Sequence, residues 1–290
     1  MPSLEIAGLI TTLDLPGSSH VDCRVPKKLL LENAAPTAAD KHYINDGIEE
    51  LWWVAALKPT TIGVPEYRDV VREYLEIAVL SLTLRPGAKA DRLTELVHRA
   101  VPYPVFLVTE QMSRLHVSLA HKRWSQGETG KTVLDGDVIA VEWDGGLDAR
   151  VLHAFQNALA LANQPKSTLY ALCQGWIDTL LALHAAQMTG VFTQPTSAQH
   201  AAARREALRE CAGLGTQIAA LRTAAAKETQ IARQVEINLE LKRMQAALAS
   251  ISTVLEFANR AGAQANCNTS CLSPNQGIGV GVSAKPDATK

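Results

Sequence analysis

The feature that most constrains the fold is a run near the C-terminus, residues 201–257, without proline and without glycine after Gly215. Within it, apolar residues recur at alternating steps of four and three, at Ile237, Leu241, Met244, Leu248, Ile251 and Leu255. This is the heptad spacing of a helix with one apolar seam that packs lengthwise against another helix. We therefore predict a long coiled-coil helix over residues 196–260, whose seam binds a partner or a second copy of the chain.

The apolar pattern changes phase inside this run. An earlier register is held by Ala207, Cys211, Leu214, Ile218, Leu221 and Ala225, and the polar segment Lys227-Glu228-Thr229-Gln230 separates it from the seam. Two structures fit the change: a register stutter in one continuous rod, or a hairpin whose two arms pack on each other. Because the junction contains neither glycine nor proline, we favour the rod, which would extend about 85 Å at ~1.5 Å per residue.

The composition is that of a folded protein of 290 residues, with 47% apolar and 20% charged residues and a net charge of −1. Residues 1–146 hold 15 Lys and Arg against 20 Asp and Glu, and residues 147–260 hold 11 against 8. A chain this close to neutral has no global attraction to nucleic acid or to anionic lipid. The sequence thus excludes a strongly basic nucleic-acid-binding protein.

The sequence also predicts a cytoplasmic location. The N-terminus shows no secretory signal, and no apolar stretch is long enough to cross a membrane. The five cysteines are scattered and odd in number, which favours reduced thiols. They are Cys23, Cys173, Cys211, Cys267 and Cys271.

The first part of the chain, residues 1–146, predicts an α+β (or α/β) domain with a mixed sheet. A helix should begin after Thr37, which can cap it with Asp40 three positions later, and end near Gly47. A second helix is expected from Asp91 to Ala100. Strands are expected at Leu51–Leu57, Tyr74–Leu84, Val105–Val108, Leu115–Ala120 and Val138–Trp143, the last after a turn at Asp135-Gly136-Asp137.

Two further segments complete the predicted organisation. Residues 147–195 have the apolar stripes of a helical pair interrupted at Pro165. Residues 261–290 are small and polar, and we expect them to form a disordered tail. No internal repeat is apparent.

A glycine-rich segment, Gly127-Glu128-Thr129-Gly130-Lys131-Thr132, resembles a nucleotide-binding loop in part. A phosphate loop needs a glycine four residues before its Gly-Lys-Thr, but residue 125 is serine. The segment is followed by a turn and a strand and not by a helix, so the helix N-terminus that would hold phosphates is missing. We expect an exposed hairpin loop and not an ATPase.

The acidic residues Asp69, Glu73 and Glu76 suggest a metal-dependent nuclease as an alternative function. The strand that follows them has no acid-x-lysine pair, and Lys122 on a later strand has Ala120 two positions before it. Ion pairing at a domain edge is the simpler interpretation. Since Cys267 and Cys271 also lack further zinc ligands, we expect no metal site, no cofactor and no catalytic residues.

Basic residues cluster at three places in the otherwise acidic first part of the chain. They could converge on a phosphate group or on an acidic partner surface, although isolated histidines are more often capping or surface residues. These phosphate or partner-contact candidates are Lys27, Lys28, His98, Arg99, His121, Lys122 and Arg123.

Several longer strings resemble a bacterial family known only as domain of unknown function 4391. They are Val25–Lys28, Thr37–Val64, Tyr67–Arg85, His98–Pro104, Ser118–Trp124 and Gln230–Arg243. Members of that family sit in gene clusters with a helicase and a DNA methyltransferase, of the restriction or anti-phage kind. The resemblance brings no established reaction and no catalytic residues.

What the resemblance implies is a non-catalytic subunit of a restriction-type or anti-phage complex. Its protein partners would be the DNA methyltransferase, the helicase or both, and DNA contact and homo-oligomers are further expectations; membrane contact is not expected. A third alternative is a DNA-binding module that acts alone, with an affinity that falls steeply with salt.

Overall fold

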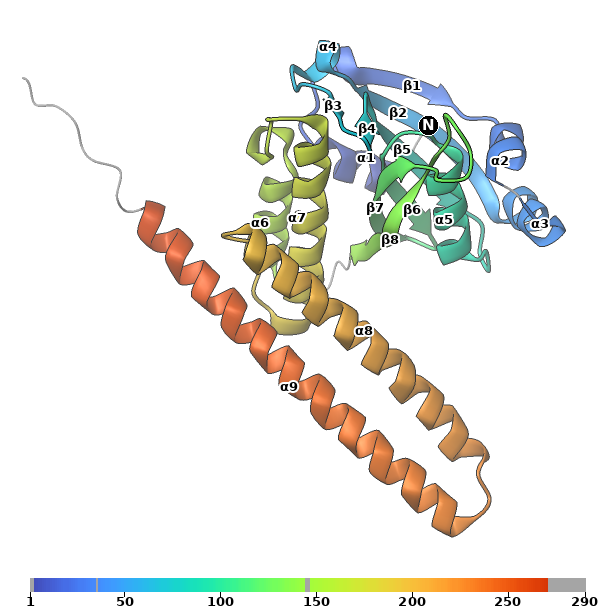
Figure 1. Cartoon of the computed structure of the whole chain (residues 1–290), viewed down its shortest axis with the longest axis vertical. Helices are drawn as coiled ribbons and strands as arrows, with labels where there is room; N and C mark the ends of the chain where they lie inside the picture. Colours follow the sequence, from blue (N-terminus) through green and yellow to red (C-terminus); the bar gives the residue numbers. More distant parts are fainter. Residues whose placement is uncertain (1–2, 35, 144–146, 271–290) are drawn as a thin grey trace, which may run out of the picture.

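A six-stranded mixed sheet organises the first half of the chain in the computed structural model, which describes residues 3–34, 36–143 and 147–270 (Figure 1). Its strand order is β1-β2-β5-β6-β7-β8, and only β5 and β6 among them pair in parallel. The predicted α+β class with a mixed sheet is therefore confirmed. The strands are β1 His20–Arg24, β2 Ile48–Leu57, β5 Ile77–Leu84, β6 Val105–Gln111, β7 Arg114–Trp124 and β8 Thr132–Trp143.

The parallel pair requires a crossover, which α5 (Ala90–Ala100) supplies. The register of β5 on β6 is continuous from Ala78 opposite Val105 to Leu84 opposite Gln111. A separate two-stranded ribbon of β3 (Tyr67–Arg68) and β4 (Glu73–Tyr74) precedes β5.

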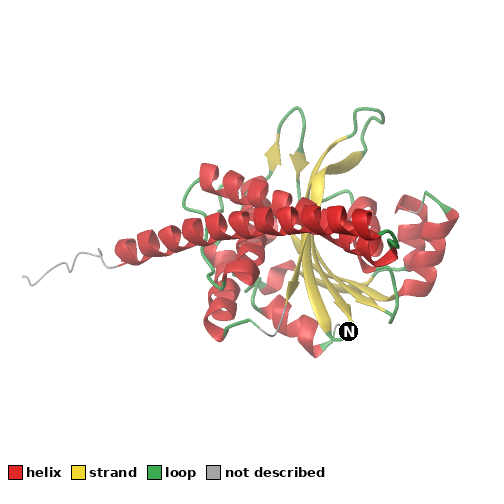
Figure 2. Cartoon of the chain, turned by 90° about the horizontal axis from the view of Figure 1, so that it is seen from below, coloured by secondary structure: helices red, strands yellow, loops and turns green. Residues whose placement is uncertain are grey.

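Helices cover both faces of the sheet (Figure 2). One face packs on α1 (Leu4–Thr11), α6 (Ala149–Leu159) and α7 (Leu169–Thr189), in a core that includes Phe106 and Trp176. The other face packs on α2 (Lys27–Ala34), α3 (Ala38–Gly47) and α5, around Leu80 and Leu96. The continuous apolar runs of β5 and β6 follow from this burial on both sides. The short elements are α4 Pro59–Ile62 and the 3-10 turns η1 Gly17–Ser19 and η2 Leu161–Asn163.

Helix α3 begins and ends where its sequence signals place it. Thr37 Oγ1 accepts the backbone N–H of Asp40 at 3.1 Å, and the last helical residue is Gly47. The Asp40 carboxylate then binds Arg92 of α5, with Nε at 2.8 Å and Nη2 at 3.0 Å. A local capping residue therefore also ties two helices together.

The turn predicted at Asp135-Gly136-Asp137 is wrong, because these residues lie within β8. Leu119 of β7 pairs with Ile139 and His121 pairs with Asp135, so β8 carries extra residues between two paired positions. Gly136 has a φ of 88°, a backbone conformation that glycine adopts readily. The turn-forming residues thus make a bulge, and the chain reverses earlier, between Trp124 and Thr132.

The predicted helical pair interrupted at Pro165 is confirmed as α6 and α7. The connection after η2 runs close to α7 at Gly175, where a Cβ atom would lie 2.5 Å from Cδ of Pro165. Only glycine permits this approach without a shift in the backbone.

The predicted continuous rod is wrong. Helix α8 (Ala198–Lys227) and helix α9 (Ile231–Ser270) form a hairpin whose arms lie side by side (Figure 1). At the junction the Glu228 carboxylate accepts the backbone N–H groups of Thr229 at 2.8 Å and Gln230 at 2.9 Å. A polar side chain therefore caps the reversal that we expected glycine or proline to mark.

The expected disordered tail is only partly within the described residues. Residues 261–270 belong to α9, and residues 271–290 lie outside the part of the chain that the structure describes. Within that part, every helix is too short or too polar to cross a bilayer.

Candidate functional site

The α8–α9 hairpin, called the arm below, projects from the body of the protein. Its base packs on α7, and Leu255 is buried in the main core together with Leu208 of α8. The predicted seam is thereby covered within the chain at the base of the arm. Leu248 and Ile251 pack against the same core, whereas Ile237, Leu241 and Met244 lie on the same side of α9 and are half-buried.

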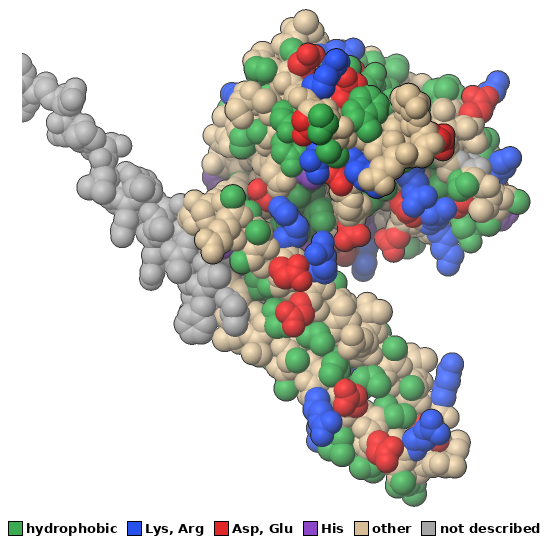
Figure 3. All heavy atoms as spheres, viewed as in Figure 1, with side chains coloured by type: hydrophobic (Ala, Val, Ile, Leu, Met, Phe, Trp, Pro, Cys, Tyr) green, Lys and Arg blue, Asp and Glu red, His purple; other side chains and the backbone are tan. Residues whose placement is uncertain are grey.

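Helix α9 also carries apolar residues on its opposite side, near the tip of the arm. Ile231, Val235 and Leu239 follow one another at steps of four and are 79%, 53% and 53% exposed. Val235 precedes Ile237 by two residues, which places it about 200° around the helix from the seam. Figure 3 shows hydrophobic side chains exposed towards the end of the arm. We call Ile231, Val235 and Leu239 the outer face of the arm.

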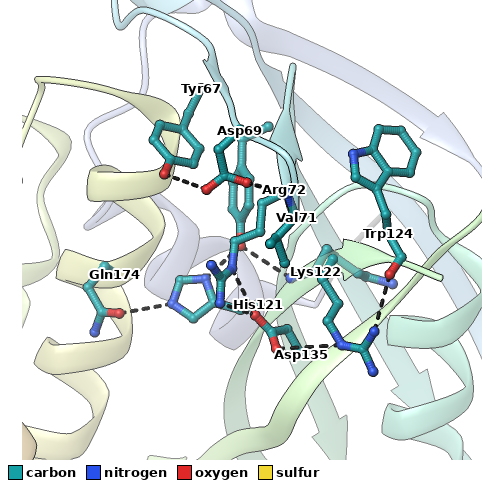
Figure 4. Close-up of polar contacts among 11 residues, drawn as sticks. Tyr67, Asp69, Val71, Arg72, His121, Lys122, Trp124, Asp135 and Gln174 are labelled. Carbon is teal, nitrogen blue, oxygen red and sulfur yellow. Dashed lines mark hydrogen bonds and ion pairs between the residues drawn. The ribbon is translucent and has the colours of Figure 1, made fainter. Parts of the chain in front are cut away.

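A polar network joins the sheet to α7 (Figure 4). Tyr74 Oη lies 2.6 Å from Nδ1 of His121, and His121 Nε2 lies 2.9 Å from Oε1 of Gln174. Gln174 Nε2 donates to Asp178 at 2.9 Å, and the Lys122 backbone N–H donates to Tyr74 Oη at 3.2 Å. Three of these residues come from β4 and β7, and two from α7.

These contacts fix the proton positions. Because Oε1 of Gln174 can only accept, His121 carries its proton on Nε2, and Nδ1 accepts the hydroxyl proton of Tyr74. Burial lowers the pKa of His121 and raises the pKa of Tyr74, so both groups are held neutral. With both ring nitrogens engaged, His121 has no lone pair left to accept a substrate proton.

Aromatic stacking and ion pairs close the network. Tyr170 stacks on Tyr67 and on His121, each at a centroid distance of 4.9 Å, and Arg72 lies over the Tyr170 ring. Arg72 Nε also donates to Asp135 at 2.8 Å. The network therefore holds the β3–β4 ribbon, β8 and α7 together, which is a structural role.

Two of the predicted contact residues are buried, so they cannot reach a phosphate or a partner. Lys122 Nζ donates to the carbonyl oxygens of His98 and Val101 at the C-terminal end of α5, and burial lowers its pKa to about 8. His98 Nε2 lies 2.9 Å from Ser118 Oγ, and burial lowers the pKa of His98 to about 3. A buried cation at the end of a helix offsets the partial negative charge there.

Two other predicted residues, Arg99 and Arg123, line a common cavity of about 660 Å³. Lys131 joins them from the loop between β7 and β8. We call this cavity the basic pocket. Its remaining lining residues are Glu32, Asn33, Ala34, Pro36, Ser125, Gln126, Thr132, Val133 and Leu134.

The last two basic candidates lie on the neighbouring helix α2. Lys27 Nζ donates to the backbone carbonyl of Asn45 at 2.9 Å, and Lys28 pairs with Glu32 at 3.6 Å. Since Glu32 lines the basic pocket, Lys28 lies next to its rim. The seven predicted residues therefore form no single surface, and Arg99 and Arg123 are the two that the pocket brings together.

The acidic residues of the nuclease alternative have separate partners. Asp69 accepts the Tyr67 hydroxyl at 2.7 Å and the backbone N–H groups of Val71 and Arg72. Glu73 pairs with Arg68, and Glu76 pairs with Lys58 at 3.2 Å. Among the described residues, no group of three or more His, Cys, Asp or Glu side chains could hold a metal ion.

The mixed sheet with helices on both faces and a helical arm defines the architecture of this chain. The model of a family described as a domain of unknown function (DUF4391) matches residues 13–248, and the chain belongs to that family. The match spans the sheet, the basic pocket and the outer face of the arm. No curated protein matches the chain. No solved structure matches it either.

Sequence reasoning missed Lys131 and the α7 part of the network. Lys131 belongs to the glycine-rich segment that predicts an exposed hairpin loop, and the sequence does not show that this loop lies beside α2 and α5. Tyr170, Gln174 and Asp178 recur at steps of four in an otherwise apolar helix. That polar stripe was the available signal for a buried network.

Proposed function

We propose that this protein is a non-catalytic subunit of a bacterial restriction-type or anti-phage complex, and that the outer face of its arm docks on a larger enzyme of that complex. A DNA methyltransferase or a helicase is the expected partner, as the resemblance to the family implies. The complex would work in the cytoplasm.

The observation that carries this proposal is that α9 is apolar on two opposite sides near the tip. The seam side is covered by α8 and the body, whereas Ile231, Val235 and Leu239 stay exposed. A surface helix normally has one apolar side, which packs on its own protein, and polar residues on the opposite side. Exposed apolar groups that are contiguous and surrounded by polar residues are typical of a binding surface.

The shape of the arm also supports docking. The two helices enclose a groove of about 520 Å³, lined by Ile218, Leu248, the small residues Gly215, Ala249 and Ser252, and the polar residues Arg222 and Gln245. Grooves between helices accept side chains of a partner helix. The arm therefore offers a groove and, closer to its tip, an apolar face.

The nuclease alternative receives less support from the geometry. Asp69, Glu73 and Glu76 are each bound to a different neighbour, and a metal-dependent reaction needs carboxylates that converge on one ion.

Co-expression with the DNA methyltransferase and the helicase of the proposed complex tests the proposal. The tagged protein should capture at least one of them in stoichiometric amount. Val235→Glu and Leu239→Glu should abolish the capture, because each places a charge in the apolar contact. Val70→Glu is the matched control, since Val70 is a 95% exposed valine in the β3–β4 turn, away from the arm.

Two outcomes would contradict the proposal. One is that neither enzyme is captured. The other is capture that survives both charge substitutions in the arm, or that Val70→Glu also abolishes. A homodimer that dissociates with Val235→Glu would assign the outer face to a second copy of the chain.

A further inference from the structure

We propose that the basic pocket binds the phosphate group of a nucleotide unit, which a free nucleotide or a nucleic-acid strand could carry. This inference does not depend on the role of the arm, because the pocket lies on the body, between α2, α5, β7 and β8.

The pocket concentrates positive charge within an acidic part of the chain. Its lining includes Arg99, Arg123 and Lys131 against one acidic residue, Glu32, whereas residues 1–146 hold 15 Lys and Arg against 20 Asp and Glu. Lys122 is buried under the end of α5, where burial and, to a smaller extent, the nearby Arg99 guanidinium lower the pKa of its ammonium group. A concave surface lined by one sign of charge raises the local concentration of anions.

The three cations come from three different elements and surround the cavity. Arg99 is on the last turn of α5, Arg123 is near the end of β7, and Lys131 directly precedes β8. An anion with several charged oxygens can contact all three at once, and a carboxylate with two oxygens cannot do so as well. Arginine also binds phosphate through two parallel N–H groups.

Each of the three cations has a partner in the structure, and Arg99 pairs with Glu95 of the same helix. Arg123 Nε lies 3.7 Å from Asp135, which Arg72 binds at closer range, and Lys131 pairs with Glu128 at 2.9 Å on the surface of the loop. Surface ion pairs contribute little and are screened by salt. The Arg123 and Lys131 side chains can therefore turn towards a ligand at low cost.

Neutral hydrogen-bonding groups complete the lining. Asn33, Gln126 and Ser125 lie around the cavity, and its volume of about 660 Å³ is in the usual range of small-molecule sites. The described lining contains no aromatic ring on which a base could stack. The pocket is therefore suited to bind phosphate and sugar and not to distinguish one base from another.

Fluorescence anisotropy of the full-length protein with a short single-stranded oligonucleotide bearing a 5′-phosphate tests this inference. If the three cations each contact a phosphate, the logarithm of the affinity should fall with the logarithm of salt concentration with a slope of about −2. Arg99→Gln and Lys131→Gln should each weaken binding and reduce that slope by about 0.7. Both side chains are half-exposed, so the variants should fold.

Arg114→Gln is the matched control, because Arg114 is an exposed arginine at the other end of β7. Binding that both pocket variants weaken and the control does not would support the inference. Competition by adenosine monophosphate would then assign the pocket to free nucleotides, and its failure would assign it to nucleic acid. Absence of binding at low salt, or equal effects of Arg114→Gln and the pocket variants, would overturn it.

Discussion

The ammonium group of Lys122 lies 2.8 Å from the carbonyl oxygen of Val101, one residue beyond α5. The same group donates to the His98 carbonyl, so one lysine of β7 satisfies two carbonyl oxygens at the end of the crossover helix. The lysine is 1% exposed. It is thus a structural cation that fixes α5 on the sheet.

Replacement of this lysine should therefore destabilise the fold. Lys122→Met keeps most of the side-chain volume but leaves the His98 and Val101 carbonyls without their donor. We expect the free energy of unfolding to fall by about 1–3 kcal/mol, measured by urea denaturation. Lys28→Met, at an exposed site on α2, should change it by less than about 0.5 kcal/mol. Equal stability of the Lys122→Met variant and the parent would show that the contact is dispensable.

His98 predicts how stability depends on acid. Its pKa is about 3 in the folded protein and 6.5 for the free side chain, so between these values the unfolded chain binds a proton that the folded protein excludes. The free energy of unfolding should fall as the pH decreases from 6.5 towards 3, with His98 contributing up to about 1.4 kcal/mol per pH unit. His98→Asn should make this dependence shallower. The measurement is a series of denaturation curves between pH 7 and pH 4. If the free energy of unfolding falls with pH equally in the variant and the parent, His98 does not cause the dependence.

The sequence predicts those features of the fold that depend on neighbouring residues, and it fails where contacts between distant segments decide the structure. Thr37 and Gly47 bound α3 because capping acts within one turn, and the apolar runs of β5 and β6 reflect their burial on both faces. The bulge at Gly136 was taken for a turn because the same residues favour both structures. Pairing with β7 selects the bulge over the turn, and this pairing cannot be inferred from the residues next to Gly136 in the sequence.

The candidate site shows the same limit. The clustering of His98-Arg99 and of His121-Lys122-Arg123 suggested one surface, but neighbours on a strand point to opposite faces. His121 therefore contacts α7, whereas Lys122 is buried under α5. Of the predicted residues, Arg99 and Arg123 line the pocket, which lies where α5 and β7 both end. The phase change of the heptads coincides with the reversal of the arm, where the Glu228 carboxylate accepts the backbone N–H groups of Thr229 and Gln230.

The hairpin form of the arm can be tested by cross-linking. Gly215 and Ser252 line the same groove, so Gly215→Cys and Ser252→Cys in one chain should join through a short bismaleimide, as mass spectrometry of the digest would show. In a continuous rod the two positions would be about 55 Å apart at ~1.5 Å per residue. An intermolecular cross-link in place of the intramolecular one would instead indicate arms exchanged between two copies.

Gly175 should tolerate no side chain. Gly175→Ala places a methyl group against Pro165, which must move together with the connection between α6 and α7. We expect a loss of about 1–3 kcal/mol in the free energy of unfolding. Gly213→Ala in α8 is the matched control, since its Cβ would meet nothing within 4 Å. There the better helix former should stabilise the protein by up to about 1 kcal/mol. If both substitutions change the free energy of unfolding by a similar amount, close packing of Gly175 on Pro165 does not explain the loss.

The central claim is that the outer face of the arm binds a larger enzyme, and the molar mass of the purified mixture tests it most directly. Light scattering of this protein with the DNA methyltransferase or the helicase of the proposed complex should give a single species whose mass equals that of a complex. With Val235→Glu the same mixture should separate into its components, while the variant keeps the thermal stability of the parent because Val235 is half-exposed. Separate components for the unmodified protein with both enzymes, or an intact complex with Val235→Glu, would contradict the account.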